Sequence, residues 1–185
     1  MIDTFYKTSL ILFLILMKAT LQDSSTVIID FKTREDISDW TILDDSVMGG
    51  ISQGFFTLNN SGNALFSGIV RTENNGGFSS ARFGFKTIDI TNFKSIKLKV
   101  KGDGKVYQFR IKDDRSQRYA YIHSFKTTGK WETISINLDA FYPSFRGNRL
   151  DKPNFSSNKI EEITFLIGNK IRESFSLEIE KIYLD

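Results

Sequence analysis

The stretch Lys97-Leu98-Lys99-Val100-Lys101 (KLKVK) alternates charged with apolar residues. A period of two is typical of a β-strand that buries one face. Further stretches follow the same rule, and no window of helical length shows an apolar stripe with a period of about 3.6 residues. The pattern predicts an all-β fold with low helix content. We expect its buried residues to include Trp131, Ile134, Ile136, Phe165, Ile167, Leu177 and Ile179.

Turn residues separate these stretches. Asn74-Asn75-Gly76-Gly77 and Gly102-Asp103-Gly104 tolerate positive φ, as tight hairpins require. About ten to twelve short strands at this spacing are typical of an antiparallel sandwich or barrel. We therefore expect one domain over residues 27–185.

The composition excludes several kinds of site. There is no Cys, and His123 is the only histidine, so thiolate and multi-histidine metal sites are excluded. The net charge of +3 comes from interspersed charges, without the basic stripe that nucleic-acid binding requires. We expect no cofactor, no metal site and no nucleic-acid partner.

An apolar run from Leu10 to Met17 lies near the N-terminus. It has the size of a signal-peptide core and is shorter than the roughly 20 residues that span a bilayer. We therefore expect residues 1–22 to be a signal peptide, with export to the periplasm or the medium and no stable transmembrane span. A mitochondrial location is not expected, because this segment has no Arg and no basic amphipathic face. A buried strand or an uncleaved anchor is the alternative.

The segment Asp44 to Ser52 (DDSVMGGIS) combines acids, hydroxyls and paired glycines. Asp45 and Ser46 can bond neighbouring backbone N–H groups, which predicts a tight, self-bonded connection. The alternative is a loop that also contacts a ligand or partner, with Asp45, Ser46, Met48 and Ser52 as candidate binding residues.

The segment Asn74 to Arg82 forms a second glycine-rich unit, with Asn75 and Arg82 as candidate binding residues. Glycines permit close backbone approach, so we expect this hairpin to meet the Asp44 to Ser52 loop in space. Arg82 is then expected to bond Asp45 or carbonyl groups of that loop. A surface binding role for Arg82 is the alternative.

A third group lies between Val106 and His123. If Tyr107, Phe109 and Ile111 face the core, Gln108 and Arg110 face outward. Tyr119, Tyr121 and His123 share one face of the next strand and, with Arg110, are candidates for a sugar or peptide platform. The alternative is that these tyrosines pack inward.

Catalysis is not expected. The acid pairs Asp113-Asp114 and Glu161-Glu162 are adjacent in the chain, and neighbouring strand residues point to opposite faces. Neither pair therefore brings two carboxylates together, as glycoside hydrolysis requires.

The chain resembles the complex I intermediate-associated protein family. The matching stretches are DSVMGGIS (45–52), FSG (66–68) and NGGFSSAR (75–82), and Arg110, Tyr119, Trp131 and Phe145-Arg146-Gly147 also fall where the family places such residues. The resemblance covers roughly Phe31 to Leu184. It implies a galactose-binding-like antiparallel β-sandwich of the jelly-roll type, and adds Arg146 to the candidate binding residues.

The resemblance also implies a non-catalytic role in association with another protein. Mitochondrial members of the family assist assembly of the respiratory NADH:ubiquinone oxidoreductase. The leading hypothesis is therefore a scaffold domain whose partner is an envelope or respiratory-complex protein. A carbohydrate-binding module is the alternative, and a carboxylate hydrolase is a weaker third. An exposed aromatic pair beside polar groups in a cleft favours sugar, whereas a broad apolar patch favours a protein.

Overall fold

The computed structural model describes residues 25–185, apart from the side chains of Val47, Met48 and Asn75. Over that range the chain forms thirteen strands and four short 3-10 turns, and no α-helix. The strands are β1 (Thr26–Asp30), β2 (Trp40–Asp44), β3 (Gln53–Leu58), β4 (Ala64–Val70), β5 (Ser79–Asp89), β6 (Ser95–Lys101), β7 (Val106–Lys112), β8 (Ala120–Lys126), β9 (Glu132–Asn137), β10 (Tyr142–Phe145), β11 (Asn148–Arg149), β12 (Lys159–Ile167) and β13 (Glu173–Leu184). The turns are η1 (Phe31–Thr33), η2 (Asp45–Met48), η3 (Glu73–Asn75) and η4 (Leu138–Ala140).

The predicted signal peptide, residues 1–22, lies outside the described residues. Among the residues that are described, no helix is long and apolar enough to cross a membrane.

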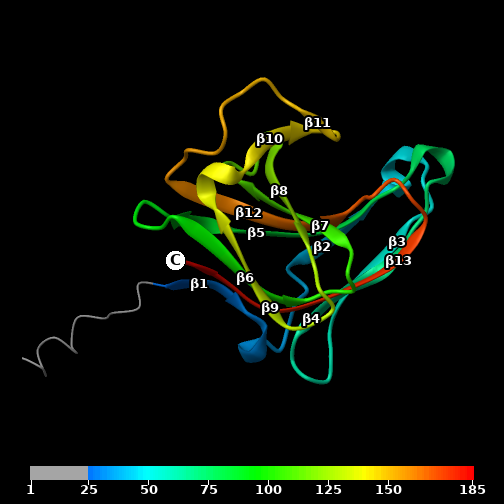
Figure 1. Ribbon diagram of the computed structural model, residues 1–185, viewed down its shortest axis with the longest axis horizontal. Helices are drawn as coiled ribbons and strands as arrows, with labels where there is room; N and C mark the ends of the chain where they lie inside the picture. The colour runs from blue at the N-terminus through cyan, green and yellow to red at the C-terminus, as the bar shows by residue number, and fades with distance from the viewer. Residues whose placement is uncertain (1–24) are drawn as a thin grey trace, which may run out of the picture.

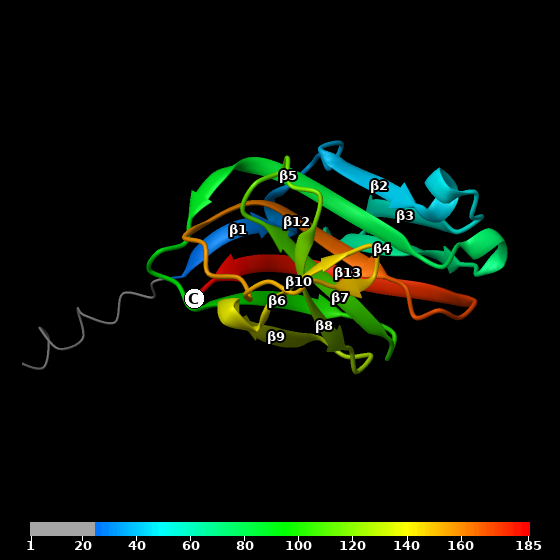
Figure 2. The same cartoon turned by 90° about the horizontal axis from the view of Figure 1, so that it is seen from above.

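The described strands form two antiparallel sheets, which confirms the predicted all-β sandwich (Figure 1). Sheet A has the order β3-β4-β13-β6-β9, and β1 pairs with β13 beside this path. Sheet B has the order β11-β10-β8-β7-β12-β5-β2. Because Thr26 pairs with Leu184, the C-terminus lies next to the start of β1 in both views (Figure 2).

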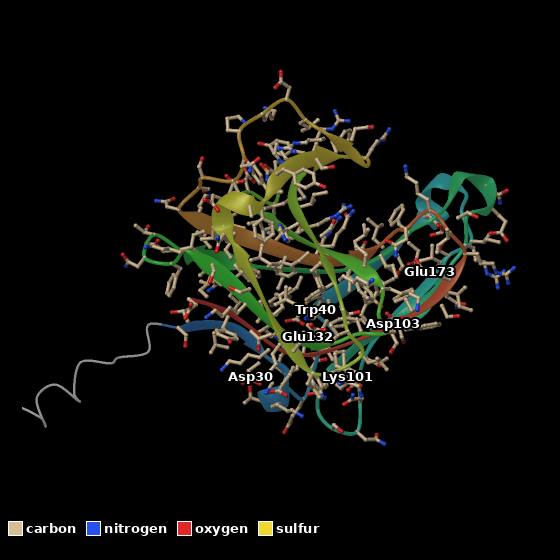
Figure 3. The ribbon with its side chains drawn as sticks, in the orientation of Figure 1. Asp30, Trp40, Lys101, Asp103, Glu132 and Glu173 are labelled. Carbon is tan, nitrogen blue, oxygen red and sulfur yellow. The ribbon has the colours of Figure 1, made fainter. Side chains whose placement is uncertain are left out.

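Aromatic side chains fill much of the space between the sheets. Trp40 of β2 lies near the middle of the molecule (Figure 3), with its ring stacked 4.3 Å from Phe56 and 5.3 Å from Phe83, centroid to centroid. Phe165 of β12 lies 5.0 Å from Phe109 of β7. Stacked and tilted rings add specific contacts to the burial of apolar area. This core links the strands of sheet B that carry the candidate site.

The predicted core is mostly confirmed, with one error. Ile136, Phe165, Ile167, Leu177 and Ile179 are buried, and Ile134 packs against them half-buried. Trp131 was expected to be buried and is 40% exposed. Its position explains this: Ile134 and Ile136 point inward, so an odd-numbered residue such as Trp131 falls on the outer side of β9.

An irregularity in β12 sets the direction of Glu162. The pairing of β12 with β5 shifts between Ile160 and Glu162, as at a β-bulge. Ile160 and Ile163 both belong to the core, although three positions separate them. A bulge re-aims the side chains that follow it. Glu162 therefore points away from sheet A, opposite Lys112 of β7 and Gly84 of β5.

Candidate functional site

The two glycine-rich segments meet around one carboxylate, as predicted. Asp45 has no exposed surface, and its carboxylate accepts hydrogen bonds from the Ser52 N–H at 2.9 Å and from the Ser52 hydroxyl. Across the gap it accepts from the N–H groups of Gly77, at 2.6 Å, and Phe78, at 3.2 Å. Burial alone would raise the pKa of Asp45, but the hydrogen bonds outweigh it and hold the pKa below its ordinary value.

The paired glycines make room for this carboxylate. A Cβ on Gly50 would lie 2.2 Å from the nearer Asp45 oxygen, and one on Gly76 would lie 2.6 Å from the other. Any side chain at either position would collide with Asp45. The DSVMGG and NNGG motifs therefore have a structural role, which is to clamp η2 and η3 together.

The predicted bond between Arg82 and Asp45 is wrong. Arg82 of β5 points to the opposite side of its sheet, where its Nε lies 3.5 Å from a Glu162 oxygen. The alternation of β5 explains this, since Ala81 and Phe83 are core residues and Arg82 between them must face outward. Glu162 also lies 3.3 Å from the Lys112 ammonium, so two cations share its carboxylate.

Arg82 belongs to a row of side chains on the surface of sheet B that points away from sheet A. We call this surface the outer face. Strand pairing places five residues of adjacent strands side by side across it: Arg82, Thr164, Arg110, Ile122 and Tyr142. Neighbouring rows contribute Gln108, Lys112 and Glu162.

Arg110 lies near the centre of the outer face, as its predicted outward direction requires. Its Nε and one terminal nitrogen donate to the Gln108 side-chain oxygen, at 3.1 and 2.6 Å. Burial lowers the pKa of Arg110 to about 10; Tyr142 acts against this shift, and the like charge of Arg82 adds to it. Among the described residues no carboxylate forms an ion pair with it.

Tyr121 and His123 point toward the core, as the alternative interpretation held. In the pairing of β7 with β8, His123 lies opposite Phe109 and Tyr121 opposite Ile111, both of which are core residues. The His123 ring lies 5.9 Å from that of Phe141. Tyr119 contacts Tyr121, with their rings 5.5 Å apart and their hydroxyls 3.4 Å apart. These residues do not join Arg110 on the outer face.

Arg146 occupies the turn between β10 and β11. Its φ is 51° and that of Gly147 is 79°, the left-handed region that tight hairpins use. The guanidiniums of Arg146 and Arg118 lie 5.4 and 5.3 Å from the ring centre of Phe145. Arg146 is thus exposed at the sheet edge, away from the Asp45 clamp.

The remaining candidates lie on the clamp loops. Ser46 is exposed, and its carbonyl accepts from Gly49 N–H at 3.0 Å. Met48 and Asn75 end η2 and η3, and their side chains lie outside the described part of the chain. Ser52 is buried and bonds both Asp45 and the backbone of Arg71. Binding by these four residues stays a prediction.

Sequence reasoning missed Glu162, Thr164 and Tyr142 as parts of the outer face. Alternation with the core residues Ile163 and Phe165 points Glu162 and Thr164 outward, but only the strand order sets them beside Arg82 and Arg110. Tyr142 lies in a short strand after η4 and carries no signal in the sequence that would place it beside Arg110.

A second candidate feature lies on the other sheet. A polar hollow of about 570 Å³ is lined by Trp131 together with Asn59, Asn63, Lys101 and Glu178, among others. Glu178 accepts from Asn59 at 2.9 Å and pairs with Lys101 at 3.3 Å. Over residues 25–185, no three acidic or histidine side chains come together as a metal site would require.

Solved structures share this fold. The family 11 carbohydrate-binding module of a Clostridium thermocellum cellulosomal cellulase superimposes with a TM-score of 0.64 at 18% identity, covering 87% of this chain and 94% of the module. The same family's module in complex with a mixed-linked tetrasaccharide gives 0.63, also at 18% identity, over 86% and 94%. At this identity the likeness shows a shared β-sandwich fold.

Relatives match by sequence over most of the chain. Complex I intermediate-associated protein 30, mitochondrial, of Mus musculus is 24% identical over 189 residues, 90% of this chain. The Drosophila melanogaster protein of that name is 23% identical over 184 residues, 86% of this chain. The match spans 58% and 62% of these relatives' own lengths.

These relatives correct the expected location. Both are named as mitochondrial proteins, which overturns the expectation of export without a mitochondrial location. The model of the family described as Complex I intermediate-associated protein 30 matches residues 29–179. Because that match covers most of the sequence, this chain belongs to the Complex I intermediate-associated protein 30 family.

Proposed function

We propose that this chain is a non-catalytic binding domain that acts in the mitochondrion, where it associates with a protein of assembling respiratory complex I. Family membership supports this partner, since the mouse and fruit-fly relatives carry both the location and the complex in their names. These relatives are longer than the matched region, so the domain carries the recognition surface and not necessarily every part of their activity.

The observation that carries the recognition surface is the charge of the outer face. Arg82 and Lys112 lie beside one carboxylate, that of Glu162, and Arg110 lies in the same row as Arg82 without an ion pair among the described residues. Charged side chains on a sheet face steer and orient a complementary partner. The outer face of sheet B is therefore the surface assigned to the partner.

Native electrophoresis of mitochondria tests this function. The expected result is that the protein migrates with a subcomplex of complex I, and that deletion of its gene lowers the amount of complete complex. Recovery of the protein outside mitochondria, together with normal complex I in the deletion cells, would contradict the proposal.

A carbohydrate-binding role is the second candidate. One solved neighbour binds a mixed-linked tetrasaccharide, and Trp131 offers an exposed ring beside the amides and carboxylate of the polar hollow. Stacking on an aromatic ring with nearby polar groups is a common mode of small-ligand recognition. Affinity electrophoresis in mixed-linked glucan tests it: retardation that Trp131→Ala removes and Thr133→Ala keeps supports this role, and unretarded migration excludes it for that glucan.

A further inference from the structure

Arg110 holds a partly buried positive charge that the described residues leave without a counter-ion. The Gln108 side-chain oxygen, a neutral acceptor, takes both of its hydrogen bonds. A guanidinium has five N–H donors, so this single oxygen leaves most of them unused. Placing a cation in a poorly hydrated position without an anion costs free energy.

Arg82 adds a second guanidinium to the same row, and one of its nitrogens is buried without a hydrogen bond from the described residues. Its Nε is buried and has no hydrogen bond within the described range, since Glu162 at 3.5 Å is an ion-pair contact only. The Glu162 carboxylate is also shared with Lys112. Glu162 thus neutralises one of two cations beside it and contributes nothing to Arg110.

The two arginines are placed to act on one group. Thr164 of β12 pairs with Arg82 of β5 on one side and with Arg110 of β7 on the other, so one strand separates the two arginines. Strands are spaced by about 4.8 Å, and two such spacings are within the combined reach of two long side chains. Repulsion between the two positive charges raises the free energy of the site while no anion is bound.

The floor of this row is apolar or neutral and recessed. Thr164, Ile122 and Leu166 are all buried although they face outward, because longer side chains stand around them. Because these residues lie below the surrounding side chains, a projecting side chain fits this position better than a flat, extended surface such as a membrane. Arginine guanidiniums match carboxylates in planar, paired hydrogen bonds.

We propose that Arg110 and Arg82 form a seat for a carboxylate, contributed by a glutamate or aspartate of an acidic segment of the protein partner. This inference rests on the proposed protein-binding function and specifies the chemistry of its surface. Gln108 is a positioning residue, because it holds the Arg110 guanidinium in place through the two hydrogen bonds.

Binding of an oligoglutamate peptide to the purified chain, followed by fluorescence anisotropy, tests the seat. Arg110→Gln removes the charge and is expected to weaken binding by about tenfold or more, the loss of one charge-assisted contact. Arg172→Gln removes the same charge from an exposed loop and is the matched control, with an expected change of no more than about twofold. Equal affinities of wild type and Arg110→Gln would overturn the seat.

Two further readouts separate the alternatives. The melting temperature of Arg110→Gln should be unchanged or higher, because an unpaired buried cation is removed; a clear fall would assign Arg110 a structural role and overturn the proposal. Inorganic phosphate that competes as strongly as the peptide at the same concentration of anionic groups would overturn the choice of an acidic protein segment.

The outcome is distinct from that of the proposed function. If Arg110→Gln weakens peptide binding while the wild-type protein fails to migrate with complex I subcomplexes, the seat stands and the assigned partner is wrong. If the variant still migrates with those subcomplexes and binds peptide normally, the partner stands and the seat is wrong.

Discussion

The carboxylate of Asp45 accepts a 2.6 Å hydrogen bond from the backbone N–H of Gly77, 32 positions later in the chain. This contact joins the turn after β2 to the turn before β5 and fixes one end of this strand pair at the edge of sheet B. The DSVMGG and NNGG motifs thus surround and bond the buried Asp45 carboxylate, whereas partner recognition is assigned to the outer face of sheet B.

Replacing Asp45 should destabilise the fold strongly. Asp45→Ala leaves the N–H groups of Ser52, Gly77 and Phe78 without their acceptor, and we expect a loss of about 3 kcal/mol in the free energy of unfolding. Urea melts measure it. Ser46→Ala, at the exposed neighbouring position, should change stability by no more than about 0.5 kcal/mol. Equal losses of stability in Asp45→Ala and Ser46→Ala would contradict the stabilising role of the Asp45 hydrogen bonds.

The same carboxylate should make stability depend on pH. Its native pKa lies below the ordinary value of 3.8, so the unfolded chain binds the proton more tightly. The stabilisation from Asp45 is therefore complete above pH 3.8 and is lost as the pH falls through the native pKa. Melts of wild type and Asp45→Asn over a pH series should converge toward acid, and a constant difference would contradict this.

Gly50 and Asp45 should be energetically coupled. A Cβ at Gly50 would lie 2.2 Å from the carboxylate, so Gly50→Ala should cost about 1–3 kcal/mol in the wild-type background. In the Asp45→Ala background the two shortest contacts, with the carboxyl group, are removed and only the contact with the Cβ of residue 45 at 2.8 Å remains, so the second change should cost less. A double-mutant cycle measures the difference. Strict additivity would show that the glycine is required for another reason.

Glu162 should matter more to stability than Arg82. The Glu162 side chain is 8% exposed and contacts two cations, whereas that of Arg82 is 40% exposed. Glu162→Gln leaves Lys112 and Arg82 facing each other without an anion, and we expect a loss of about 2–3 kcal/mol. Arg82→Ala should cost less than about 1 kcal/mol. Calorimetric melts of both variants check the order, and a reversed order would contradict the placement of Glu162.

The two tryptophans should differ in fluorescence. Trp40 is buried among stacked rings and Trp131 is 40% exposed. Acrylamide should quench one component of the emission, and Trp131→Phe should remove that component while leaving the blue-shifted emission of Trp40. Retention of the quenchable emission in Trp131→Phe would show that Trp131 is buried, as we first expected.

The sequence predicts the sandwich well because its strands obey a strict period of two. The direction of Gln108 and Arg110 follows from Tyr107, Phe109 and Ile111 in the core. The meeting of the two glycine-rich loops also follows, since paired glycines indicate close approach. Trp131 was misplaced although the same alternation from Ile134 and Ile136 assigns it outward.

The rest depends on contacts between distant strands. The neighbours of Glu162 and Arg110 depend on the strand order β8-β7-β12-β5, and the pairing of β12 with β5 shifts just before Glu162. Local alternation assigns a residue to one face of its sheet but does not give the order of the strands. Arg82 was therefore assigned to Asp45, the nearest acid by motif, and its contact with Glu162 became visible only in the assembled sheet.

Site-specific photo-crosslinking in mitochondria tests most directly whether the outer face of sheet B is the recognition surface. A photoreactive residue in place of Ser124, the exposed neighbour of Gln108 on the outer face, is compared with one in place of Thr133, on the exposed side of sheet A. The account predicts that the probe at position 124 captures a complex I subunit and that the probe at position 133 does not. Capture at position 133 alone, or at neither position in mitochondria that are assembling complex I, would contradict it.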